Sequence, residues 1–171
     1  MKSTGAPETA RFFFALDGAM IDLRRAHGTD AHDLALLRAD SLAEQGYVVP
    51  AQREPFVREA EDSFARAFAR DGMVAWLLCD GETVVGSACA MYFERLPFPD
   101  GSLHAELSGV YVAPAYRRRG WASKLVAAVV DDVRRSPVRK TFLRPAPGKR
   151  ALYARLGFVD DATGVMSLSA R

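Results

Sequence analysis

Residues 107–122 read LSGVYVAPAYRRRGWA, and this stretch decides the fold. Its first half is apolar, aromatic and β-branched, which favours a mostly buried strand ending near Val112. Pro114 has no amide hydrogen to donate to a sheet, so it ends that strand. From Trp121 onward apolar residues recur at helical spacing and charged residues fall on the opposite side. The stretch therefore predicts a strand, a tight turn and an amphipathic helix that rests on the sheet.

The turn between this strand and this helix is basic and contains Arg117, Arg118, Arg119 and Gly120. A helix N-terminus leaves amide hydrogens unpaired and carries partial positive charge, so it attracts anions. Gly120 leaves no side chain where an anion would have to approach the backbone. The turn therefore predicts a phosphate-binding loop, and the alternative interpretation is a solvated run of surface charge.

Two common phosphate-binding motifs are absent from this loop. It has no G-x-x-x-x-G-K-[ST], and of the glycines in G-x-G-x-x-G only Gly120 is present. The pattern Arg117-x-x-Gly120-x-Ala122, preceded by Val112 and Pro114, instead resembles the acyl-coenzyme A loop of the GCN5-related N-acetyltransferase (GNAT) family. The segment YARLGF at residues 153–158 resembles the C-terminal motif of the same family. The resemblance covers about residue 19 to the end.

The resemblance implies an α+β fold. The expected fold is a mixed, mostly antiparallel twisted sheet of six to seven strands, flanked by helices, with a splay between the fourth and fifth strands. The local patterns predict strands over residues 19–25, 73–79, 83–93, 103–112, 138–143, 157–159 and 163–168. They predict helices over residues 30–44, 55–70, 121–135 and 149–156.

The chain is expected to hold one domain. Residues 19–171 form the predicted GNAT-like domain, and residues 1–18 form an N-terminal extension. Phe12, Phe13 and Phe14 in that extension are costly to leave in water, so we expect them to dock on the domain or on a second subunit. A homodimer is therefore one possible assembly, and a disordered leader is the alternative.

The composition excludes several classes of protein. The 171 residues are 49% hydrophobic and carry a net charge of +2, an ordinary balance for a globular domain. The small net charge and the lack of aromatic residues among the arginines argue against nucleic-acid binding through residues 117–119 and 134–150. Cys79 and Cys89 lack metal-ligand spacing, which predicts small buried hydrophobes and no metal. The apolar runs are too short to span a membrane, so we expect a cytoplasmic protein with no membrane partner.

The resemblance also implies a reaction. It implies transfer of an acetyl group from the co-substrate acetyl-coenzyme A (acetyl-CoA) to a primary amine. We expect the transfer to be direct, within a ternary complex, because Cys79 and Cys89 lie in predicted strands without a neighbouring histidine to activate them. The amine belongs to a small molecule or a protein, and the sequence does not identify it. The alternative is a non-catalytic acyl-CoA-binding or regulatory domain.

The resemblance assigns the cofactor contacts to the strand end and the basic loop. Gly109, inside the strand, predicts a bulge or close backbone approach, or else a packing glycine. The family's thioester carbonyl would meet the amides near Val110. The full predicted set is Val110, Tyr111, Val112, Arg117, Arg118, Arg119, Gly120, Trp121, Ala122 and Ser123.

Two residues are candidates for proton transfer. The resemblance places Tyr153 near the sulfur of coenzyme A, and a phenol pKa of about 10 keeps it protonated at neutral pH. We expect Leu152 and Leu156 to form the buried stripe of its helix, with Tyr153 rotated off it; a half-buried core tyrosine is the alternative. Glu106 is the candidate base, or else an exposed residue of an alternating strand. Other candidates for the base are Glu94, Asp100, His104 and water.

Overall fold

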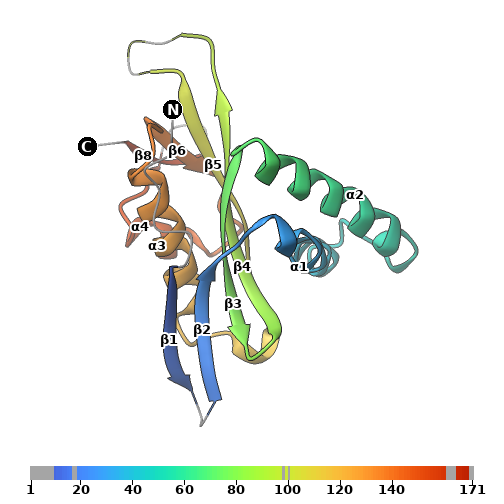
Figure 1. Ribbon diagram of the computed structural model, residues 1–171. Helices are drawn as coiled ribbons and strands as arrows, with labels where there is room; N and C mark the ends of the chain where they lie inside the picture. The colour runs from blue at the N-terminus through green and yellow to red at the C-terminus, as the bar shows by residue number, and fades with distance from the viewer. Residues whose placement is uncertain (1–9, 17–18, 98, 100, 161–164, 170–171) are drawn as a thin grey trace.

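The computed structural model describes residues 10–16, 19–97, 99, 101–160 and 165–169, and these form an eight-stranded sheet with helices on both faces (Figure 1). The strand order is β1-β2-β3-β4-β5-β6-β8-β7. Neighbouring strands run antiparallel, except that β5 and β6 run parallel. The predicted α+β fold with a mixed, mostly antiparallel sheet is confirmed.

Most predicted elements lie within two or three residues of their expected bounds. The strands are β1 (Arg11–Leu16), β2 (Ala19–Arg25), β3 (Met73–Asp80), β4 (Thr83–Glu94), β5 (Leu103–Val112), β6 (Lys140–Leu143), β7 (Val159–Asp160) and β8 (Met166–Ser169). The helices are α1 (Ala31–Glu44), α2 (Pro50–Ala69), α3 (Trp121–Arg134) and α4 (Arg150–Ala154). Two short 3-10 helices, η1 (Gly28–Asp30) and η2 (Pro114–Tyr116), precede α1 and the basic loop.

The sheet has one more strand than the six to seven predicted, because residues 11–16 of the expected extension form β1 and pair with β2. Phe12 stacks on Trp76 with ring centroids 5.8 Å apart, and Phe14 meets Trp121 edge to face at 5.4 Å. Phe12 and Phe14 therefore dock on the domain as expected, whereas Phe13 stays 59% exposed. Residues 11–16 were not predicted as a strand because consecutive phenylalanines show no period-two alternation. Residues 1–9 and 17–18 of the expected extension lie outside the described residues.

Helix α2 begins at Pro50, and not near Pro55 as the sequence suggested. Both prolines suit a first helical turn, where the missing amide hydrogen costs nothing. Pro50 takes that position, and Pro55 lies inside the helix. The buried side of α2 includes Val57 and Ala67.

Helices α1 and α2 cover one face of the sheet, and α3 and α4 cover the other (Figure 1). The predicted apolar stripe of α3 is fully buried at Leu125, Val126 and Val129, in a core that also contains Leu107 of β5. This packing fixes the start of α3 beside the end of β5. The basic loop is therefore held between two rigid elements.

The buried carboxylate of Asp132, which is 2% exposed, ties α3 to the sheet. Its Oδ2 accepts a hydrogen bond from Trp76 Nε1 at 2.9 Å and lies 3.1 Å from Arg25 Nε. Asp132→Ala is expected to lower the free energy of unfolding, measured by urea denaturation, by about 3–5 kcal/mol. The reason is that the part-buried guanidinium of Arg25 loses this carboxylate. Asp131→Ala removes an exposed carboxylate on the same helix and should cost less than about 0.5 kcal/mol. Equal losses in the two variants would contradict this account.

The fourth and fifth predicted strands, residues 103–112 and 138–143, correspond to β5 and β6 because β1 was not predicted. The splay predicted between them is present. These strands pair only at His104 with Lys140, Ala105 with Thr141 and Glu106 with Phe142. Beyond Glu106, residues 107–112 of β5 continue beside β4 and have no partner in β6. The two strands therefore separate just where β5 approaches the basic loop.

The two cysteines are buried in β3 and β4, as expected of small hydrophobes. Among the residues that the structure describes, no cluster of His, Cys, Asp or Glu side chains is arranged to hold a metal ion. Within the same residues, no helix has both the length and the apolar character that crossing a membrane requires.

Candidate functional site

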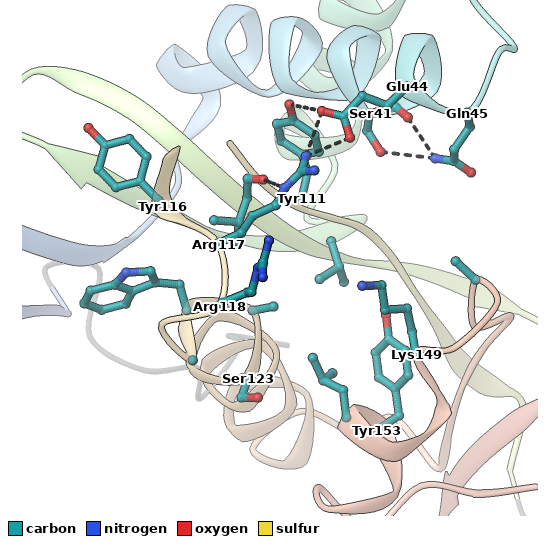
Figure 2. A pocket seen from close by; sticks show the side chains of 17 residues that line it. Ser41, Glu44, Gln45, Tyr111, Tyr116, Arg117, Arg118, Ser123, Lys149 and Tyr153 are labelled. Atoms are coloured by element: carbon teal, nitrogen blue, oxygen red, sulfur yellow. Dashed lines mark hydrogen bonds and ion pairs between the residues drawn. The ribbon is translucent and has the colours of Figure 1, made fainter. Parts of the chain in front are cut away.

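A pocket of about 650 Å³ lies between the end of β5 and the segment that follows β6. This volume is in the range of small-molecule sites. Its other walls are the last turn of α1 and the loop into α3 (Figure 2). The lining residues are Ser41, Glu44, Gln45, Val110, Tyr111, Val112, Tyr116, Arg117, Arg118, Gly120, Trp121, Ala122, Ser123, Ala146, Lys149, Leu152 and Tyr153.

The β5 wall of the pocket begins at a β-bulge. Between the pairs Ser87–Tyr111 and Cys89–Ser108, β4 supplies only Ala88, whereas β5 supplies Gly109 and Val110. Gly109 has φ +60°, and a Cβ there would lie 3.1 Å from Cys89 Sγ. A bulge leaves a residue outside the regular ladder and redirects the strand. The bulge predicted for Gly109 is therefore confirmed, and it stands next to the pocket residue Val110.

The loop into α3 has the backbone of an anion site. Arg118 and Gly120 have φ +60° and +81°, and Gly120 is the N-cap of α3. Turns with left-handed residues gather successive amide hydrogens into a concavity that binds anions. Among the residues that the structure describes, none has an atom within 4 Å of the position that a Cβ of Gly120 would take. The backbone at the start of α3 is therefore open to a ligand.

Arg117 lines this pocket, but its guanidinium is bonded to the protein itself (Figure 2). Its Nε donates to the carbonyl of Val112 at 2.7 Å, and its Nη2 lies 2.7 Å from each carboxylate oxygen of Glu44. The hydroxyl of Tyr111 donates to Glu44 Oε1 at 2.9 Å. The hydrogen bond from Arg117 is the main cause that lowers the pKa of Glu44. Glu44 is therefore ionised at neutral pH and neutralises Arg117.

The remaining charges on the pocket wall are positive. Figure 2 shows Arg118 extending from the loop and Lys149 extending from the segment before α4 into the same space. With Arg117 and Glu44 paired, these two cations give the lining an excess of positive charge, which favours an anionic ligand. Arg119, the third arginine predicted to contact the cofactor, does not line the pocket.

Tyr153 projects from α4 into the pocket near Lys149 (Figure 2). The expectation that Leu152 and Leu156 form the buried stripe was wrong, because Tyr153 is 9% exposed and the two leucines are only partly buried. Helix α4 ends at Ala154, so Leu156 lies outside it and helical spacing does not place it. Burial raises the pKa of the Tyr153 phenol, which stays protonated at neutral pH.

The candidate bases that lie in the described part of the chain, Glu106, His104 and Glu94, do not line the pocket. Glu106 lies in the paired part of β5, with its side chain 48% exposed and 3.8 Å from Arg144 Nη1. His104 is buried, with Nε2 3.4 Å from the carbonyl of Gly101. Glu94 is exposed at the end of β4, and Asp100 lies outside the described residues. Glu106, His104 or Glu94 would therefore have to accept a proton from the pocket through water or through a change in geometry.

Several pocket residues were not predicted. Ser41, Glu44 and Gln45 come from the polar side of α1, and no local motif in the sequence marks them. Tyr116 is fixed by its hydroxyl, which donates to Asp80 Oδ2 at 2.6 Å. Lys149 was detectable only as part of the basic stretch at residues 144–150. These side chains come together through the fold and not through sequence spacing.

Comparison with known proteins defines the class. The model of the acetyltransferase (GNAT) family matches residues 37–158, so the chain belongs to this family. A mycothiol acetyltransferase from Kineococcus radiotolerans is 34% identical over 99 residues, which are 58% of this chain and 31% of that protein. The chain therefore spans about a third of the length of that relative.

Solved structures share the fold. A predicted acetyltransferase from Clostridium acetobutylicum, solved with acetyl-CoA, has a TM-score of 0.72 and 19% identity, and the match covers 84% of this chain and 92% of that one. A GCN5-related N-acetyltransferase from Kribbella flavida has a TM-score of 0.59 and 30% identity, covering 81% of this chain and 33% of that one. The strand β5, its bulge, the basic loop and helix α3 therefore belong to a fold that these acetyltransferases share.

Proposed function

We propose that the protein is an N-acetyltransferase that transfers the acetyl group of acetyl-CoA to a primary amine. The observation that carries this proposal is the pocket at the splay, which joins the bulge of β5 to the open loop at Gly120. The pantetheine arm would lie between β5 and the segment after β6. The pyrophosphate would bind the amides around Gly120 and Ala122, with Arg118 nearby. The acetyl-CoA in the structure from Clostridium acetobutylicum supports this choice of co-substrate.

The transfer needs one polarised carbonyl and two proton transfers. The amide of Val110, within the bulge, would hydrogen-bond the thioester oxygen and stabilise the negative charge that develops there. The amine nitrogen attacks the carbonyl carbon, the new C–N bond forms, and the C–S bond breaks. Tyr153 gives its proton to the departing thiolate, and the nitrogen loses a proton to Glu106 or to water. The products are an acetylated amine and coenzyme A.

The pH dependence of kcat/KM tests which group accepts the proton from the amine. If Glu106 accepts the proton through water, Glu106→Gln should lower kcat/KM most at low pH, where little free amine is present. A profile parallel to that of the unmodified protein assigns the proton to water alone.

Incubation with acetyl-CoA and a panel of small-molecule and peptide amines tests the proposed function. We expect free thiol to appear only with an accepted amine, together with the acetylated amine in mass spectrometry. Binding of acetyl-CoA without thiol release, for every amine in the panel, would favour a non-catalytic acyl-CoA-binding domain.

Direct transfer predicts that neither cysteine carries the acetyl group. Both thiols are buried, and burial raises the pKa of Cys79 to about 11 and that of Cys89 to about 12, so neither is a thiolate at neutral pH. The Cys79→Ala and Cys89→Ala variants should each keep turnover within a few-fold, with thermal melting checked alongside. An acetyl-cysteine trapped by mass spectrometry, or ping-pong kinetics, would contradict direct transfer.

A further inference from the structure

Four residues on the pocket wall are linked in a closed ring by hydrogen bonds and by the peptide bond between Tyr111 and Val112 (Figure 2). Arg117 donates to the carbonyl of Val112 and to Glu44, Tyr111 donates to Glu44, and Tyr111 and Val112 are neighbours on β5. The guanidinium also lies over the Tyr111 ring, 5.4 Å from its centroid. We call this set the Glu44 ring. It joins α1, β5 and the basic loop, which are far apart in the sequence.

The Glu44 ring holds the first residue of the loop, and other contacts hold the residues on either side. Tyr116, just before Arg117, is bound to Asp80, and Trp121, just after Gly120, is buried. Between these points Arg118 has φ +60°, a conformation that costs free energy for any residue with a Cβ. Such a conformation persists only when the surrounding structure enforces it. The Glu44 ring supplies part of that enforcement.

We propose that Glu44 is a positioning residue: acting through Arg117, it holds residues 117–120 in the conformation that binds the phosphates of acetyl-CoA. This inference rests on the proposed function. Glu44 need not touch the reacting atoms. Arg117, the first residue of the motif, then holds the loop in place and does not bind the phosphates itself. The phosphates are bound by Arg118 and the loop amides.

Whether removal of Glu44 tightens or weakens acetyl-CoA binding separates this proposal from two simpler ones. If Glu44 were only a negative charge beside an anion site, its removal would tighten acetyl-CoA binding. If Arg117 were mainly a phosphate ligand, removal of Glu44 would release it and would also tighten binding. If Glu44 is a positioning residue, its removal weakens binding, and Arg117→Ala produces the same defect.

Titration with acetyl-CoA of Glu44→Ala, Glu44→Gln, Arg117→Ala and the double variant Glu44→Ala/Arg117→Ala tests the proposal. We expect each alanine variant to bind about tenfold more weakly, and the double variant to be no worse than the weaker single variant. Glu44→Gln keeps an oxygen for Tyr111 or Arg117, so it should lose less. KM for acetyl-CoA should rise while kcat at saturation stays within a few-fold. Tighter binding by Glu44→Ala, or additive losses in the double variant, would overturn the proposal.

Asp40→Ala provides a matched control. Asp40 is on the same helix, its Oδ1 lies 2.7 Å from Arg53 Nη2, and its side chain is 41% exposed against 42% for Glu44. This variant should bind acetyl-CoA like the unmodified protein.

Hydrogen exchange of the ligand-free variants tests, independently of acetyl-CoA, whether the contact between Glu44 and Arg117 holds the loop. The amides of residues 117–123 should exchange faster in Glu44→Ala than in Asp40→Ala. If the unmodified protein bound no acetyl-CoA, the proposed function would fail, yet this comparison would still decide the structural claim. Equal exchange in the two variants would overturn it.

Discussion

Gly120→Glu is expected to weaken acetyl-CoA binding at least about tenfold, which is roughly 1.4 kcal/mol or more. The space above Gly120 is open, so the new side chain would take the place of the ligand. Its carboxylate would also repel the phosphates that Arg118 and Lys149 attract. Isothermal titration calorimetry of the folded variant measures the loss directly.

Gly81→Glu separates this steric and electrostatic effect from backbone strain. Gly81 also has a positive φ, of +58°, and no described residue has an atom within 4 Å of the position that its Cβ would take. It lies in the turn between β3 and β4 and does not line the pocket. Both variants should lose a similar stability, roughly 1–2 kcal/mol, because both place a side chain on a left-handed residue. Equal acetyl-CoA affinities in the two variants would show that the loop is not part of the acetyl-CoA binding site.

Tyr153→Phe is expected to lower turnover roughly 10²–10⁴-fold, the usual contribution of a general acid. It removes only the hydroxyl, so the ring keeps its contact with Phe158 at 6.1 Å between centroids and acetyl-CoA affinity should change little. Steady-state kinetics at saturating acetyl-CoA measures the loss. Tyr92→Phe, on β4 and outside the pocket lining, is a control for loss of the hydroxyl of a partly buried tyrosine and should keep its turnover.

The pH dependence gives the Tyr153 assignment a second test. Burial raises the pKa of Tyr153, so the proton donor persists through the neutral range and is lost only at a pH above the usual value for tyrosine. The kcat of the unmodified protein should therefore fall on the alkaline side as the phenol ionises. Tyr153→Phe should lack this decline. Unchanged turnover in Tyr153→Phe would mean that solvent protonates the thiolate and that Tyr153 is structural.

The sequence predicted the centre of the fold well because its signals are local. β5 ends just before Pro114, Gly120 caps the start of α3, and the amphipathic pattern of α3 places its buried side. The resemblance then added the splay, which no local pattern shows. Of the ten predicted cofactor contacts, all except Arg119 line the pocket.

The sequence did not reveal features that depend on distant contacts. Glu44 is 73 residues from Arg117, and helical spacing alone does not show what α1 meets at its last turn. The orientation of Tyr153 was misjudged because the helix that carries it is shorter than its pattern suggests. Glu106 has the polar alternation expected of an exposed strand residue, and this same pattern cannot show whether it reaches the amine.

Hydrogen exchange of the unmodified protein with and without acetyl-CoA tests the central claim most directly, namely that the pocket at the splay binds this co-substrate. The account predicts saturable binding of one acetyl-CoA per chain, with slower exchange at the amides of residues 110–112 and 117–123. Failure to bind, or protection confined to segments outside these two, would contradict it.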